Sequence, residues 1–124
     1  MARPHITDAQ RRTRLGRRHA LATAHRVEDP VAAARSVIAL HATEPASVHL
    51  AVAARVDGTT VTDVDRALYG ERSLVKQLAM RSTLFAFPRE RLPAALSGAS
   101  DRVASSFTSR IARALVAHGI TTDP

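Results

Sequence analysis

Two polar side chains, His41 and Thr43, close a mostly apolar stretch and are of types that can do chemistry. An imidazole that is neutral near pH 7 can accept a proton from a water molecule, and a hydroxyl group can orient that water. Glu44, the next residue, offers a negative charge. The alternative is structural: His41 packs, and Thr43 caps a helix end or begins the turn into Pro45, because polar residues at helix ends often satisfy backbone groups.

The stretch that must position this pair runs from Asp29 to Pro45 and carries helix signals at both ends. Asp29 is a suitable N-cap, and Pro30 suits the first helical position, where its missing N–H is no loss. Apolar residues then recur at helical spacing. Pro45 marks the end, since the residue before a proline is pushed out of helical geometry. We therefore predict one buried helix across this stretch, with His41 and Thr43 in its last turn.

The chain is also basic: it has 18 Lys+Arg against 11 Asp+Glu and a formal charge of +7, so it can attract negatively charged partners. Such an excess favours polyanions, above all nucleic acid. The chain is also rich in alanine, and nearly all its basic residues are arginine, which GC-rich codon usage would produce in any protein. Charge alone therefore leaves nucleic-acid binding and a merely solvated basic surface as equal alternatives.

Several of the arginines lie close together near the N-terminus. A helix is expected from Thr7 or Asp8, as its cap, to about Ala24. Its Arg11, Arg14 and Arg18 are spaced three and four residues apart and so share one face. Such a face can follow phosphates along a DNA backbone.

A change in the spacing of apolar residues, from helical spacing to alternation, predicts a β-hairpin over 74–88. The strands LVKQLAM and TLFAF are joined at Arg81-Ser82, and Pro88 bounds the second strand. Lys76 and Arg81 on this hairpin are further candidates for phosphate contact. A short helix capped by Thr62 precedes the hairpin, and a final helix begins at Ser100 or Asp101 and ends at Gly119.

Other classes of site are disfavoured. The chain has no cysteine, and its six histidines are scattered, so we expect no metal site. It has no Gly-rich phosphate loop, and we expect no cofactor. We find neither a secretory signal nor an apolar run long enough to span a membrane, and we expect a cytoplasmic protein with no membrane partner. The length of 124 residues predicts one domain over 1–118, with 119–124 as a tail or the start of a following segment.

Three stretches together resemble a known family: RPHITDAQRRTRLGRRHAL, DPVAAARSVIALHATEPASVHLAVAARV and LVKQLAMRSTLFAFPRERLPA. They are similar to the front of the winged helix DNA-binding domain-containing proteins, which include bacterial DNA glycosylases that unhook interstrand crosslinks and excise bulky alkylpurines. The resemblance covers about residues 3–118. It implies the first segment of a longer protein and a mainly α, winged-helix-like (α+β) fold with a small β-hairpin.

The resemblance also implies where chemistry would occur. In the glycosylases, the segment that matches LHATEP carries a glutamine, one spacer, and then glutamine or aspartate, a pair taken to hold the attacking water. This chain has His41 and Thr43 at those positions. Release of a cationic N7-alkylpurine needs a positioned water and stabilisation of an oxocarbenium-like sugar, but no strong acid, because the base leaves as a neutral molecule.

The sequence therefore predicts a protein that binds double-stranded DNA and is similar to alkylpurine glycosylases. Its catalytic candidates are His41 and Thr43. Its DNA-binding candidates are Arg11, Arg14, Arg18, Lys76 and Arg81. Whether the chain is an enzyme stays open at this point. The alternatives are a non-catalytic DNA-binding or regulatory protein on the same scaffold, and a domain that only mediates protein contacts.

Overall fold

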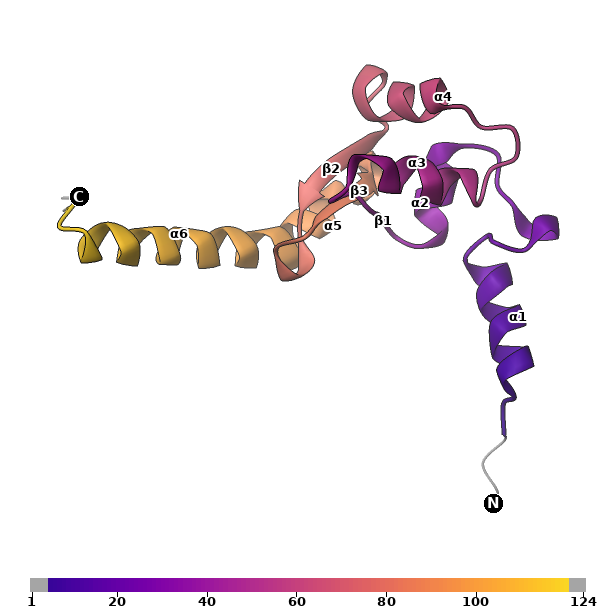
Figure 1. Ribbon diagram of the computed structural model, residues 1–124, viewed down its shortest axis with the longest axis horizontal. Coiled ribbons are helices and arrows are strands. Elements are labelled where there is room, and N and C mark those ends of the chain that lie inside the picture. The colour runs from indigo at the N-terminus through magenta and orange to yellow at the C-terminus, as the bar shows by residue number, and fades with distance from the viewer. Residues whose placement is uncertain (1–4, 121–124) are drawn as a thin grey trace.

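The computed structural model describes residues 5–120, which form a small antiparallel sheet surrounded by helices (Figure 1). The helices are α1 (Asp8–Arg18), α2 (Pro30–Ser36), α3 (Pro45–Ala53), α4 (Val61–Asp65), α5 (Leu92–Ala95) and α6 (Asp101–Ala117). The strands are β1 (Leu40–His41), β2 (Leu74–Leu78) and β3 (Leu84–Pro88). The prediction of a mainly α fold with a small sheet is therefore confirmed.

The sheet has the strand order β1-β3-β2, with both pairs antiparallel. Leu40 and Lys76 both pair with Ala86, and side chains that pair across strands lie on the same face of a sheet. Because side chains alternate along a strand, the neighbouring residues of all three strands lie on the opposite face. We name the face that carries Ala86 the inner face and the other the outer face.

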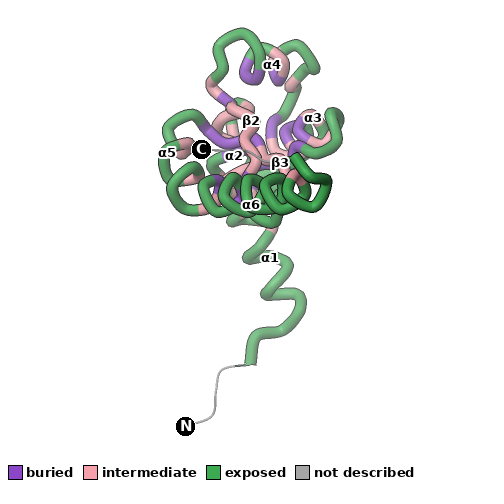
Figure 2. The backbone as a smooth tube through the Cα atoms, turned by 90° about the vertical axis from the view of Figure 1, so that its left-hand side faces the viewer, coloured by how far each residue is buried: buried purple, intermediate pink, exposed green. Residues whose placement is uncertain are grey.

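The hydrophobic core lies between the inner face and the helices α2, α3 and α4. Its buried residues are Ala33, Ala34, Leu40, Ala42, Val48, Val52, Val56, Val64, Ala67, Leu68, Leu74 and Ala86. Most are small, so the elements approach one another closely. Burial is concentrated at the centre of the molecule, while α1 and most of α6 are exposed (Figure 2).

Helix α1 begins as predicted but ends earlier. The Thr7 hydroxyl accepts from the backbone N–H of Gln10, and the Gln10 side chain accepts from the N–H of Thr7, which completes a capping box. The expected end near Ala24 is wrong, because Ala20 takes a left-handed φ of 56° and stops the helix. Arg55 holds this corner by donating through Nε to the carbonyl of His19 at 3.0 Å.

The prediction for Asp29 to Pro45 is half right. The Asp29 carboxylate caps α2 by accepting from the N–H of Ala32 at 2.7 Å, and Pro30 is at the first position. The helix then ends at Ser36, not near Pro45, because the chain turns and enters β1. Pro45 does mark a boundary, but as a first position of α3, where a proline is also favoured.

The predicted hairpin is confirmed as β2 and β3. The turn between them contains Arg81 and Ser82, whose φ values are 52° and 57°. Hairpin turns favour such left-handed residues, although Asn-Gly adopts them at lower cost.

Helix α6 extends away from the rest of the molecule (Figure 1). It begins at Asp101, as predicted, and Gly119 follows its end with a φ of 71°. Phe107 and Ile111 on its apolar face are 38 % and 57 % exposed. No helix within residues 5–120 is long and apolar enough to cross a membrane.

Either of two threonines could cap helix α4. Thr62 was expected, but Thr60 is the N-cap: its hydroxyl accepts from the N–H of Asp63, whose carboxylate accepts from the hydroxyl and the N–H of Thr60. These two bonds lower the pKa of Asp63 below its ordinary value. We expect Thr60→Ala to lower the free energy of unfolding by about 1 kcal/mol, measured by urea denaturation at pH 7. Thr62→Ala, the matched control, should change it by less than about 0.5 kcal/mol.

The same pair predicts a pH dependence. The contribution of Asp63 to stability is complete above the ordinary pKa of an aspartate and is lost as the pH falls through its lowered folded-state pKa. Thr60→Ala should therefore flatten the acid side of the stability curve, whereas Thr62→Ala should not. Equal effects of the two substitutions would contradict the assignment of Thr60 as the cap.

A second prediction concerns Ile38, in the turn between α2 and β1. Its φ is 76°, although β-branched residues rarely adopt the left-handed region, and it is 63 % exposed. Ile38→Gly removes a left-handed penalty of about 1–2 kcal/mol and adds about 0.5–1 kcal/mol of backbone entropy in the unfolded chain. We expect the free energy of unfolding to rise by about 0.5–1 kcal/mol. Leu50→Gly, at a residue 69 % exposed within α3, should lower it by about 1 kcal/mol; a loss at both positions would contradict the backbone strain at Ile38.

Candidate functional site

His41 and Thr43 lie on the segment that leaves β1 toward α3. Leu40 and Ala42 are each 2 % exposed, whereas His41 and Thr43 are exposed. The N–H of Ala42 donates to the carbonyl of Leu84 at 2.9 Å, which extends the pairing with β3 by one residue. Two exposed residues that flank a buried one in extended chain point to the same side. The pair is therefore brought together on the outer side of the sheet, not in the last turn of a helix.

An aromatic ring holds the His41 imidazole. His41 pairs directly with Phe85 of β3, and the two ring centroids are 5.6 Å apart at an interplanar angle of 78°. Phe87, two residues further along β3 on the same face, has its ring centroid 6.1 Å from that of Phe85 and is 4 % exposed. Edge-to-face contacts of this kind fix ring orientation as well as adding stability. Phe85 was not among the predicted site residues, because its contact with His41 depends on strand β1, which lies in a stretch predicted to be helical.

Thr43 does not cap a helix, but it lies in the bend that leads into Pro45, as the structural alternative expected. Helix α2 ends seven residues before it, and the N-cap of α3 is Glu44, whose side chain makes no capping bond. Within residues 5–120 the Thr43 hydroxyl has no hydrogen bond with the protein. The exposed Glu44 carboxylate lies next to it in the chain. An imidazole, a hydroxyl and a carboxylate thus follow one another at an exposed corner.

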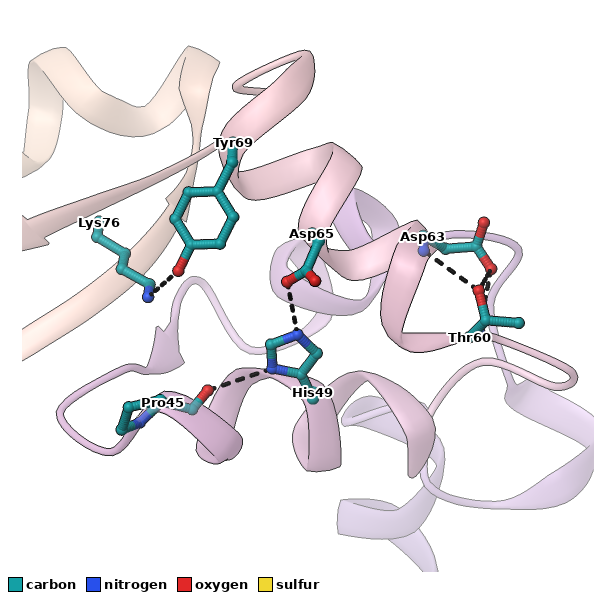
Figure 3. Close-up of polar contacts among 7 residues, drawn as sticks. All are labelled: Pro45, His49, Thr60, Asp63, Asp65, Tyr69 and Lys76. Atoms are coloured by element: carbon teal, nitrogen blue, oxygen red, sulfur yellow. Dashed lines mark hydrogen bonds and ion pairs between the residues drawn. The ribbon is translucent and has the colours of Figure 1, made fainter.

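His49, by contrast, is a structural histidine. Its Nδ1 lies 3.2 Å from the carbonyl oxygen of Pro45, and its Nε2 lies 3.0 Å from Oδ1 of Asp65 (Figure 3). Both ring nitrogens therefore face oxygen acceptors, and the side chain joins α3 to α4.

Lys76 is on the other face of the sheet from His41. Its Nζ donates to the hydroxyl of Tyr69 at 2.7 Å (Figure 3). Because it pairs with Ala86, it belongs to the inner face at the edge strand β2, whereas His41 is on the outer face. The structure does not bring these two residues to one surface.

The other predicted phosphate contacts are also separated. Arg11, Arg14 and Arg18 are exposed on α1, and Arg81 is exposed in the hairpin turn. The hairpin turn packs beside the start of α6, and α1 projects from the opposite end of the core (Figure 1). The described residues therefore present basic groups at two ends of the molecule.

The remaining ionisable groups with shifted pKa values are structural. Arg35 donates through Nε to Oε1 of Glu90 at 2.6 Å, which lowers the pKa of Glu90 and raises that of Arg35. Burial lowers the pKa of Arg55. Within residues 5–120 no three His, Asp or Glu side chains converge in a way that would hold a metal ion.

Residues 34–121 match the family described as DNA glycosylase AlkZ-like. The chain therefore belongs to the AlkZ-like family of DNA glycosylases. No curated protein and no solved structure matches it. The matched residues include the whole sheet together with His41 and Thr43, and they leave out α1, which carries Arg11, Arg14 and Arg18.

The alternation around Ala42 gives a stability test of this geometry. His41→Ala and Thr43→Ala remove exposed side chains, so each should change the free energy of unfolding by less than about 1 kcal/mol. Ala42→Val adds volume to a filled core and should lower it by about 1–3 kcal/mol. Chemical denaturation of the three variants measures these differences. A large loss in His41→Ala with none in Ala42→Val would contradict the orientation described above.

Proposed function

We propose that this protein excises alkylated purine bases from double-stranded DNA, with His41 and Thr43 at the reacting centre. The observation that carries the proposal is the placement of these two exposed side chains on one side of the sheet, within the segment that matches the glycosylase family. The family match supports the reaction class, and the geometry supports the choice of residues.

The proposed reaction replaces the base with a hydroxyl group. A water molecule oriented by Thr43 attacks C1′ of the sugar, the C1′–N9 bond breaks, and its electron pair neutralises the positive charge of an N7-alkylated guanine. His41 accepts the proton that the water loses. The Glu44 carboxylate, next to Thr43, stabilises the oxocarbenium character that develops on the sugar. The products are a neutral free base and an abasic site.

We further propose that residues 1–118, of which the structure describes 5–118, form one winged-helix domain. The order α2-β1-α3-α4-β2-β3 and the sheet order β1-β3-β2 support this interpretation. The β2–β3 hairpin is then the wing, with Arg81 at its tip, and α1 adds Arg11, Arg14 and Arg18 as backbone contacts.

Helix α4, which precedes the wing, is unsuited to reading bases in the major groove. Its Asp63 and Asp65 carry negative charge toward any approaching phosphate, and both already accept hydrogen bonds, from Thr60 and His49 respectively. Affinity for DNA would therefore come mainly from phosphate contacts, which carry no sequence information.

A specific observation favours a second candidate, a non-catalytic DNA-binding protein. His41 and Thr43 occupy the positions at which the resemblance implies a glutamine-containing pair. A protein that kept DNA binding and lost base excision would be expected to lose that glutamine-containing pair.

One experiment separates these candidates. The full chain is incubated with a duplex that carries a single 7-methylguanine, and abasic sites are scored under single-turnover conditions. We expect base release, lowered about 100-fold in His41→Ala because a general base is lost. His25→Ala, which removes another exposed histidine, is the matched control and should release the base at the wild-type rate.

Binding to an unmodified duplex is measured in parallel at about 50 and 200 mM salt. Phosphate contacts predict a steep loss of affinity over this range. Binding without release would support the non-catalytic candidate. Release at an unchanged rate in His41→Ala would remove the role proposed for that residue, and the absence of any salt-dependent binding would contradict both candidates.

A further inference from the structure

A row of three side chains crosses the outer face of the sheet. Phe85 in the central strand β3 pairs with His41 of β1 on one side and with Gln77 of β2 on the other. Directly paired residues of antiparallel strands lie on the same face, so all three point outward together. The row therefore consists of an imidazole, a phenyl ring and a carboxamide, contributed by three different strands.

The spacing of the row is set by the sheet. His41 and Gln77 are two strands apart, which places their Cα atoms about 10 Å from each other with the Phe85 ring between them. His41 is exposed, and Phe85 and Gln77 are half-buried. Phe87, two residues further along β3 on the same face, is buried and packs beside Phe85 with its ring tilted by 54°.

The Gln77 side chain retains the capacity to bind a ligand. Its Nε2 donates to the carbonyl of Leu78 at 3.2 Å, but the Ser100 hydroxyl donates to that same carbonyl at 2.6 Å. The carbonyl is therefore satisfied without Gln77. The Gln77 Oε1 atom accepts no hydrogen bond from residues 5–120, so the amide is available as both donor and acceptor.

We propose that this row receives the purine base once it has left the DNA stack. The base stacks against Phe85, Gln77 hydrogen-bonds its edge, and the attached sugar lies toward His41 and Thr43. Enzymes that act on a base extrude it from the duplex and hold it by aromatic stacking and hydrogen bonds, and an aromatic side chain beside an amide provides both. This assignment rests on the proposed function, since it names the base-binding residues of the same site.

The test uses two readouts on the full chain. The first is single-turnover release from the duplex with 7-methylguanine. The second is the fluorescence of a duplex with 2-aminopurine in place of the damaged base, which brightens when that base leaves the stack. We expect wild-type protein to brighten the probe, and Phe85→Leu and Gln77→Ala to abolish this and to slow release about tenfold or more. Affinity for unmodified duplex should change less than twofold, because phosphate contacts are unaffected.

Two variants control for structural effects. Thr83→Val changes a half-buried residue on the same face of the hairpin, outside the row, and should retain both signals. Phe85→Tyr keeps an aromatic ring and should also retain them, which separates stacking from simple loss of packing. Brightening that persists in Phe85→Leu, or its absence in wild-type protein bound to the duplex, would overturn the assignment.

The outcomes also separate this inference from the proposed function. Brightening without base release would show that the row binds an extruded base while the catalytic proposal fails. Release without brightening would show the reverse. A protein that does not bind the duplex at all would overturn both.

Discussion

The pairing of β1 with β3 is the contact on which the rest of the arrangement depends. Strand β1 has two residues, too few to persist alone, so its position is fixed by what it buries. Leu40 enters the core beneath α2 and α3, and the register that this burial selects places His41 opposite Phe85. A slip of one residue would exchange the two faces and bury the imidazole. The same hydrophobic contact that stabilises the fold thus also orients the candidate site.

The pairing of β1 with β3 requires a strained backbone in the turn before β1. The chain must leave α2 and enter the strand within residues 37–39, and it does so with Ile38 in the left-handed region. Such strain persists only where the surroundings determine the backbone, here the buried Ala34 before the turn and the buried Leu40 after it. The strained turn lies directly before His41, so backbone energy is stored beside the residues proposed to act on DNA.

The sequence correctly predicted those elements for which the local residues favour a single structure. The Thr7 and Asp29 caps and the hairpin are confirmed, and their signals lie within a few residues of one another. Residues 37–42 carry apolar side chains at helical spacing and also in alternation, and the choice is made by β3, more than forty residues away. Likewise Thr60 and Thr62 each precede an aspartate by three residues. Asp65 is engaged by His49 of α3, which leaves Thr60 and Asp63 to form the cap.

The distribution of charge restricts how a polyanion can approach. A cleft of about 440 Å³ lies between the start of α2, the loop before α4 and residues 66–73. Its charged lining residues are Glu28, Asp29, Asp57, Asp63, Arg66 and Glu71. Ion pairs from Arg26 and Arg66 neutralise only Asp57 and Asp63. This side would repel phosphates, although the chain as a whole carries a charge of +7. A DNA backbone would therefore be excluded from the acidic side and would meet α1 or the hairpin tip. His41 and Phe85 lie away from the acidic side, on the sheet face that is turned away from the α2–α4 core.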